Sequence, residues 1–306
     1  MLGDPGPTGV LMESIHVAGG PPTLLPLRSL VPVSLLGIAV GGGIGPEPAL
    51  MQTTATISAW IGRRLRASPA ELRVLTVTGL ASGLTVLFAA PLGGAVTGVS
   101  PHLTLPDLMI GAFGGVAGAA VAHLFGFMIR TCGRISARLP SWARPVAAGL
   151  ALGALGLAVP TGLTYGEAQL TALVTIPAVA VTSLLLAAIG HLASAAVTLA
   201  GDWKGGIIIP MFFVGYCLGR AMAEMSGHDG YYLVLATSMM VACNTGMTKT
   251  PLGSALVVAE MTAVTLVPPL VIAALVSLLL TSRVTFVGGQ RHRDQPAPPP
   301  ERPLPG

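Results

Sequence analysis

The chain has 306 residues, of which 52% are hydrophobic and only 9% are charged, and its formal net charge is +4. A soluble domain usually carries about 25% charged residues. This composition, with a mean hydropathy of +0.78, therefore excludes disordered, collagen-like and disulfide-rich chains and an ordinary soluble enzyme. What remains is an integral, multi-pass membrane protein in contact with a lipid bilayer. The arginines lie in short loops without interleaved aromatic residues, which disfavours nucleic acid as a partner.

Apolar segments that could cross or re-enter a bilayer follow one another along the chain. In order they are 27–43, 49–62, 70–89, 106–129, 145–159, 172–200, 207–223, 231–243, 251–263 and 266–282. A full crossing needs about 20 residues, so the short runs 49–62, 231–243 and 251–263 predict half-helices buried in protein. Glycine and proline, at 40 and 26 residues, also favour broken helices. We therefore expect an all-α membrane protein with re-entrant half-helices.

An internal repeat relates the first part of the chain to the second. Residues 90–96 (Ala-Pro-Leu-Gly-Gly-Ala-Val) recur as residues 250–256 (Thr-Pro-Leu-Gly-Ser-Ala-Leu), at an offset of 160. Residues 45–49 (Gly-Pro-Glu-Pro-Ala) match residues 206–210 (Gly-Ile-Ile-Ile-Pro) at an offset of 161. Both members of this second pair are followed by an apolar stretch and a Gly-Arg pair, at residues 62–63 and 219–220. Two matches at nearly one spacing indicate duplicated halves, as in many channels and transporters.

The repeat predicts three parts of the chain. The first half covers residues 1–140, the second half covers residues 141–288, and residues 289–306 form a proline-rich, disordered tail. We expect the two halves to be inverted relative to each other. Within them, the spacings Gly111…Gly115 and Gly149…Gly153 predict close helix packing.

The two glycine-rich breaks predict anion-binding helix ends. In the first break, residues 41–45 allow a free turn and Pro46 suits the first turn of a helix. In the second, the amides of Ile207 and Ile208 precede Pro210 at the head of another half-helix. Such ends offer unpaired N–H groups and a partial positive charge, which attract an anion. Neither break supplies a carboxylate cage or a ring of carbonyls, and the three cysteines have no ligand spacing, so we expect no metal and no cofactor.

Glu47 is the first candidate for a functional side chain. It is the only acidic residue between Glu13 and Glu71, and it stands at the break itself. An ionisable group in an apolar segment is costly and marks a functional site by default. The alternative is plain helix capping, since a carboxylate in the first turn gains about 0.3–1 kcal/mol from the helix dipole. A carboxylate that competes with an anion for the same amides could act as a pH-sensitive gate.

These motifs resemble the landmarks of the CLC family of chloride channels and chloride/proton exchangers. The motifs at 45–48, 90–94, 205–210 and 250–262 occur in the family's order, and the resemblance covers about residues 3–282. It implies an all-α fold of inverted repeats and a homodimer with one chloride path in each subunit. It also implies that Glu47 is the gating glutamate. The amides of Ile207 and Ile208, beside Gly206 and Gly45, would then bind the anion.

The chain also departs from the family pattern. The family's first filter, Gly-Ser-Gly-Ile-Pro, has only a poor counterpart at residues 3–7, where Asp4 replaces the expected serine hydroxyl. Family members have helices before this filter, so the chain is identified as a divergent member that looks N-terminally truncated. The internal glutamate of the exchangers has no equivalent at residues 98–102, which favours uncoupled, channel-like conduction. Prolines on both sides of Glu47 remove two N–H donors.

Two other interpretations stay open at this point. The chain could be an inactive, truncated relative of the family. A remoter alternative is an intramembrane enzyme using Ser82 with His123 or His191, but the usual Gly-x-Ser-Gly motif is replaced by a string with Ala81 directly before the serine. We therefore expect a non-enzymatic anion transport protein, most simply of the cell membrane.

Overall fold

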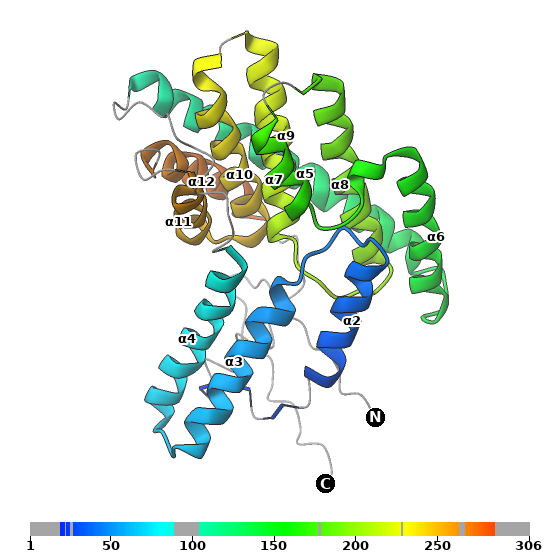
Figure 1. The fold of residues 1–306 in the computed structure, drawn as a ribbon, viewed down its shortest axis with the longest axis vertical. Coiled ribbons are helices and arrows are strands. Elements are labelled where there is room, and N and C mark those ends of the chain that lie inside the picture. The colour runs from blue at the N-terminus through cyan, green and yellow to red at the C-terminus, as the bar shows by residue number, and fades with distance from the viewer. Residues whose placement is uncertain are drawn as a thin grey trace.

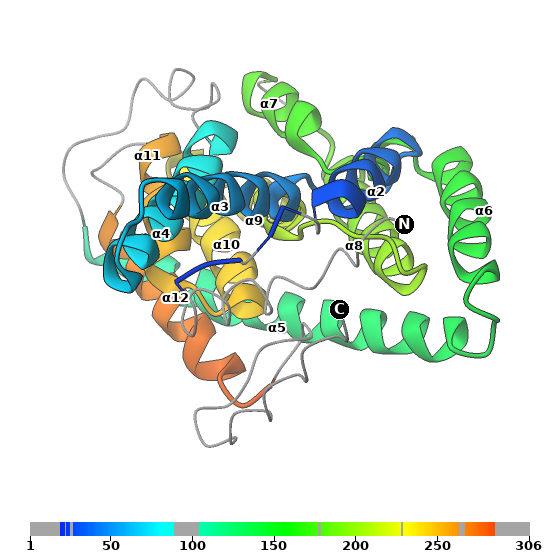
Figure 2. The ribbon, with the colours of Figure 1, turned by 90° about the horizontal axis from the view of Figure 1, so that it is seen from below.

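The computed structural model describes residues 19–21, 23–24, 27–88, 104–176, 179–227, 229–262 and 267–284. Helices make up most of this part of the chain (Figures 1 and 2). Their bounds are α2 (Leu27–Ala39), α3 (Glu47–Arg64), α4 (Pro69–Phe88), α5 (Leu105–Ser136), α6 (Ala143–Ala158), η2 (Pro160–Gly162), α7 (Glu167–Thr175), α8 (Val181–Ala200), α9 (Ile208–Ser226), η3 (Asp229–Tyr231), α10 (Tyr232–Thr248), α11 (Pro251–Thr262) and α12 (Val267–Thr281). Asp4, the stretch 90–96 and the tail 289–306 lie outside the described residues.

Helices α3 and α4 form an antiparallel pair in the lower part of the molecule in Figure 1, beside α2. Small residues allow this close approach: a Cβ atom at Gly79 would lie 2.2 Å from the Ser58 Oγ, and one at Gly83 would lie 2.5 Å from the Thr54 Oγ1. Glu71 fixes the start of α4, because its Oε2 accepts hydrogen bonds from the amide of Ser68 at 2.8 Å and from its hydroxyl at 2.7 Å. The pair therefore holds α3, and the break before it, in a defined direction.

The hydrophobic core surrounds α9. Every residue from Ile209 to Cys217 is buried, so α9 is enclosed on all sides. It packs against α10, α8 and the short α7. A helix that is apolar all round must lie inside a larger protein or in a membrane. The N-terminus of α9, which carries the second break, is thus held at the centre of the molecule.

The glycines of α5 pack closely against neighbouring helices, as their spacing predicts. Helix α5 runs along one side of the molecule (Figure 2), against α10 and α12. A Cβ atom at Gly111 would lie 2.6 Å from the Pro269 carbonyl oxygen, and one at Gly118 would lie 2.3 Å from the Ala242 Cβ. Gly149 and Gly153 of α6 make no such contact within the described chain, where nothing lies within 4 Å of a Cβ atom at either position.

One predicted run is divided in the structure. Residues 172–200 read as a single apolar segment, but α7 ends at Thr175 and α8 begins at Val181. Ile176, which follows α7, has extended backbone angles and precedes Pro177 in the sequence. A residue before proline is pushed away from helical angles, and proline itself has no N–H to continue the helix. The break was therefore encoded, but hydropathy alone conceals it.

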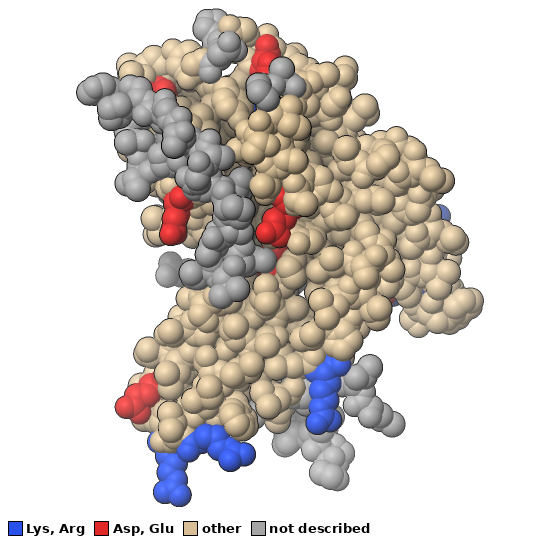
Figure 3. All heavy atoms as spheres, in the orientation of Figure 1, with Lys and Arg blue, Asp and Glu red and all other residues tan. Residues whose placement is uncertain are grey.

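The surface is that of a membrane protein. Three of the described helices, α5, α8 and α9, are long and apolar enough to cross a bilayer. In Figure 3 side chains other than Lys, Arg, Asp and Glu cover most of the visible face, while blue Lys and Arg side chains gather at the end formed by the lower parts of α2 to α4. Apolar flanks with basic ends suit the hydrocarbon core and its two interfaces.

The α5–α10 contact generates a stability prediction. Gly118→Val should lower the free energy of unfolding by about 1–3 kcal/mol, because the added side chain overlaps Ala242 in a packed interface. Thermal unfolding in detergent measures this loss as a lower midpoint. Gly149→Val is the matched control, since its site is open and its midpoint should stay within about a degree of wild type. Equal midpoints for the two variants would contradict the packing described here.

Candidate functional site

The first break turns the chain between α2 and α3 and is anchored to α8. Gly41 has φ +83°, a left-handed angle that favours glycine, and the Gly42 amide donates to the Gly37 carbonyl at 2.9 Å. The Gly43 amide donates to the Thr198 Oγ1 of α8 at 3.2 Å. A Cβ atom at Gly43 would lie 2.5 Å from the Ser194 Oγ. The first break therefore packs directly against α8, which belongs to the second half of the sequence.

The second break joins α8 to α9 and meets the first directly. The Gly45 amide donates to the Gly206 carbonyl at 2.8 Å, and the Gly206 amide donates to the Gly45 carbonyl at 2.7 Å. Together they form an isolated antiparallel bridge. Gly45 and Gly206 are the positions that the internal repeat makes equivalent. Two equivalent residues that bond each other reciprocally are related by a local twofold axis, as inverted halves require.

Glu47 lies immediately beyond this bridge. It is the first residue of α3, and its side chain is fully buried. Its Oε1 accepts a hydrogen bond of 2.8 Å from the amide of Ile209, in the first turn of α9. Its Oε2 has no hydrogen-bond partner among the described residues. A carboxylate of the first half therefore occupies the N-terminus of a half-helix of the second half.

The two bridging glycines make room for this carboxylate. A Cβ atom on Gly45 or on Gly206 would lie only 2.1 Å from the Glu47 Oε2. Any other residue at either position would collide with the carboxylate in its present place. The two glycines, one from each half of the repeat, thus form a cradle for one oxygen of the Glu47 carboxyl group.

No cation neutralises Glu47 within the described part of the chain. The ion pairs there join Arg144 to Asp202 at 3.2 Å and Arg220 to Glu224 at 3.6 Å. The stabilising group is the start of α9, whose unpaired N–H groups and dipole favour negative charge. An arrangement that stabilises a buried carboxylate in this way can also stabilise a small dehydrated anion.

The structure brings together most of the predicted site residues. Gly45, Glu47 and Gly206 are in contact; Ile207 is the residue before α9, and Ile208 is the first of α9. Ile209, whose amide binds Glu47, was not among the predicted site residues. Its signal was present, because Pro210 has no N–H and Ile209 therefore carries the last free amide before the proline. Asp4 lies outside the described residues.

The residues considered for metal binding and for nucleophilic catalysis can be located in the same part of the chain. No group of three or more His, Cys, Asp or Glu side chains that could hold a metal occurs in the described ranges. The Ser82 hydroxyl donates to the Gly79 carbonyl of its own helix at 2.8 Å. Of the two histidines considered with it, His123 contacts the Leu280 carbonyl at 3.3 Å and His191 stacks on Phe213 at 4.2 Å between ring centroids.

The fold and the site define a class: a helical membrane protein of inverted repeats whose half-helix ends meet around a buried charge. A family model described as "Voltage gated chloride channel" matches residues 10–100 and 97–282. The chain therefore belongs to the CLC family of voltage-gated chloride channels and related ion transporters. This confirms the family resemblance and the all-α fold of repeated halves.

Relatives and solved structures agree with this assignment. The chain is 28% identical over 256 residues to the "Putative ion-transport protein YfeO" of Escherichia coli O1:K1, and equally to the protein of that name in Escherichia fergusonii. These matches cover 69% of this chain. The chain spans 61% of the length of these relatives. Two solved structures share the fold at 20% identity. One is a slow cyanobacterial Cl−/H+ antiporter (TM-score 0.73, covering 90% of this chain and 77% of that one), and the other a CLC-type fluoride/proton antiporter (TM-score 0.75, covering 93% and 82%).

The space beside Gly45 generates a prediction that tests whether the Glu47 carboxylate fills it. Gly45→Ala should lower the free energy of unfolding by about 1–3 kcal/mol, because the methyl group displaces the Glu47 carboxylate from the Ile209 amide. In a Glu47→Ala background the same substitution should cost at least about 1 kcal/mol less, since the colliding atoms are gone. Unfolding midpoints of the four proteins measure this coupling. Gly253→Ala, with its nearest atom at 3.9 Å, is the control. Additive effects would show that Glu47 does not fill the cradle.

Proposed function

We propose that this protein carries small inorganic anions, chloride in the first place, across a membrane through a path gated by Glu47. One observation carries the proposal: the fully buried Glu47 carboxylate accepts the amide of Ile209 at the N-terminus of α9. A negative group therefore already occupies the most favourable place for an anion near the two breaks. The family membership supports transport as the activity.

The gate follows from competition for the same donors. While Glu47 is ionised, its carboxylate holds the Ile209 amide and an anion is excluded by charge and by space. When Glu47 is protonated it loses its charge, and the hydrogen bond to the amide weakens. The side chain can then leave, and an anion can take its place among the amides of Ile207, Ile208 and Ile209. Gly45 and Gly206 leave the room that the anion needs.

The mode of transport has two candidates. We favour uncoupled, channel-like conduction, because residues 98–102 contain no counterpart of the exchangers' internal glutamate. Proton-coupled exchange is the second candidate, which is supported by the fold shared with two proton antiporters. Recording the external pH during chloride efflux from liposomes, with a potassium ionophore present, separates the two. Efflux without proton movement supports conduction, and efflux with proton uptake supports exchange.

Several further assignments belong to the proposal. Asp4 is proposed as an anion-site residue of the first filter, and the halves are proposed to divide at residues 140 and 141. A homodimer in the cell membrane, with one path in each subunit, is the proposed assembly. The absence of any chloride flux from the purified protein would instead support the inactive relative.

The gate predicts the behaviour of a neutral variant. Glu47→Gln should raise chloride efflux severalfold at neutral pH and flatten its dependence on pH, because glutamine resembles the protonated acid and does not titrate. Efflux from liposomes at several pH values measures both effects. Glu71→Gln is the matched control: it neutralises an exposed first-turn glutamate of α4, bonded to Ser68, and should keep the wild-type profile. An unchanged rate and profile in Glu47→Gln would remove the gating role.

A further inference from the structure

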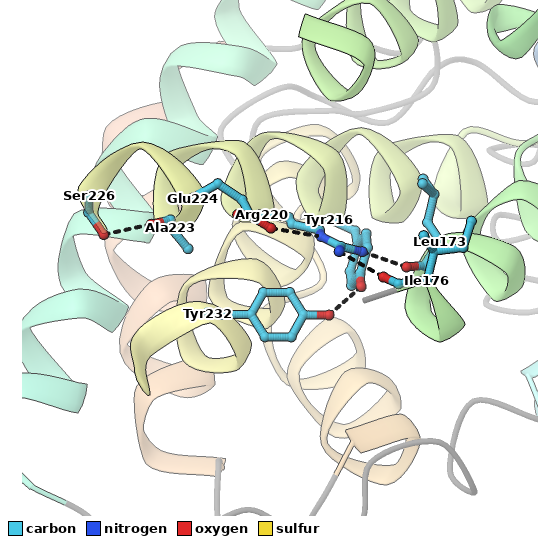
Figure 4. A network of polar contacts seen from close by, with 8 residues as sticks. All are labelled: Leu173, Ile176, Tyr216, Arg220, Ala223, Glu224, Ser226 and Tyr232. Atoms are coloured by element: carbon cyan, nitrogen blue, oxygen red, sulfur yellow. Dashed lines mark hydrogen bonds and ion pairs between the residues drawn. The ribbon is translucent and has the colours of Figure 1, made fainter. Parts of the chain in front are cut away.

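The short helix α7 lies along α9 and is attached to it at both ends. At its start, a Cβ atom on Gly166 would lie 3.0 Å from the Phe213 Cβ of α9. At its end, Arg220 of α9 donates to the carbonyl oxygens of Leu173 at 2.6 Å and Ile176 at 2.8 Å (Figure 4). Seven positions separate Phe213 from Arg220, and seven separate Gly166 from Leu173. The two helices therefore run in the same general direction, with their N-termini toward the breaks.

Arg220 is built as a fixed support for α7. Its side chain is buried, with 2% of the residue exposed. Glu224 pairs with its Nε at 3.6 Å, and its guanidinium lies 5.5 Å from the centre of the Tyr232 ring. The Tyr232 hydroxyl is in turn hydrogen bonded to that of Tyr216 (Figure 4). The last carbonyls of a helix lack partners within it, and a planar guanidinium can satisfy two of them at once.

The first half of the repeat has a comparable support. Arg63 closes the Ile-Gly-Arg sequence at the end of α3, as Arg220 follows Leu218 and Gly219 in α9. Its Nη2 donates to the carbonyl oxygen of Gly20 at 2.9 Å. In both halves, therefore, an arginine that follows a glycine in the helix after the break donates to a backbone carbonyl outside that helix.

The start of α7 lies beside the gate. The Thr164 amide donates to the carbonyl of Gly41 in the first break at 3.0 Å, so the loop before α7 is fixed there. Phe213, which Gly166 contacts, is four residues beyond Ile209, a distance of about 6 Å along α9. Glu167 is the first residue of α7 and is half-buried. It directly follows Gly166, whose Phe213 contact on α9 lies about one helical turn beyond the Ile209 amide that holds Glu47.

The other titratable groups around Glu167 are few. In the same loop, the Tyr165 hydroxyl interacts with the Glu167 side chain. From α8, the ring of His191 faces the start of α7, with its Nε2 2.8 Å from a Cβ atom placed on Gly166. From α9, Arg220 and Glu224 lie at the opposite end of α7. Of the acidic groups named here, Glu47 lies toward the start of α7, where Glu167 stands, and Glu224 lies toward its end.

We propose that α7 is a charged arm of the gate, held along α9 by Arg220 so that the Glu167 carboxylate opposes that of Glu47 and sets the pH at which the gate opens. This inference rests on the gating role proposed for Glu47. Two like charges in a poorly polarisable interior repel each other, and protonation of Glu47 relieves the repulsion. Glu167 acts through Glu47, and Arg220 is a positioning residue.

Neutralising the arm tests the proposal. In Glu167→Gln, Glu47 loses its repelling neighbour and stays ionised to lower pH, so the half-maximal pH of chloride efflux should fall by about one unit. Wild type, Glu47→Gln and the control Glu71→Gln are measured in the same liposomes. If efflux depends on pH in wild type and not in Glu47→Gln, but Glu167→Gln leaves the half-maximal pH unchanged, the gating role of Glu47 stands and the proposed role of Glu167 is wrong. A wild-type profile in Glu47→Gln overturns the gate itself.

The support by Arg220 has its own test. Arg220→Lys keeps the charge but cannot bridge two carbonyls in the same plane, so it should shift the half-maximal pH in the same direction as Glu167→Gln. Combined with Glu167→Gln it should add no further shift, because both changes act through one carboxylate. If the shifts in half-maximal pH of Arg220→Lys and Glu167→Gln simply add in the double variant, Arg220 does not act by positioning Glu167. Glu167→Gln alone decides the proposal if Arg220→Lys does not fold.

Discussion

The carboxylate of Glu47 is buried in an apolar interior, and among the described residues the group that holds it is a backbone amide at the start of α9. Burying an ionised group without compensation is prohibitively costly, so this arrangement depends on the helix end that compensates it. The rest of the site serves the same contact. The enclosed α9 keeps its N-terminus at the centre, the Gly45–Gly206 bridge brings the first half against it, and the two glycines leave space for the carboxylate.

Duplication explains why the contact can exist. A single half offers one break and one helix end, and the amide that receives Glu47 belongs to the other half. When the second half is inverted, the equivalent glycines pair across a local twofold axis, and the acid of one half reaches the amides of the other. The halves are not chemically equal, because Glu47 has no acidic counterpart after Gly206. Two equivalent breaks therefore carry only one acidic side chain, and the proposed gate depends on that single carboxylate.

The sequence predicted the breaks, the repeat and Glu47 because each depends on local chemistry: glycine for freedom, proline for helix starts and a lone acid in an apolar run. It could not predict which amide receives Glu47, since that is decided by how two segments 162 residues apart meet. Hydropathy also concealed α7 by merging it with α8. The contacts of Arg220 became visible only when α7 was placed along α9, because its partners are backbone carbonyls, which leave no signal in the sequence. The role proposed for Glu167 depends on the same placement of α7.

The central claim is that Glu47 occupies an anion site. The most direct measurement is the anomalous scattering of bromide in crystals of Glu47→Ala and of wild type, both soaked at neutral pH. The account predicts a bromide peak within hydrogen-bond distance of the Ile209 amide in Glu47→Ala, and a weak peak or none at that place in wild type. A Glu47→Ala crystal with an intact fold and no bromide at the start of α9 would contradict it.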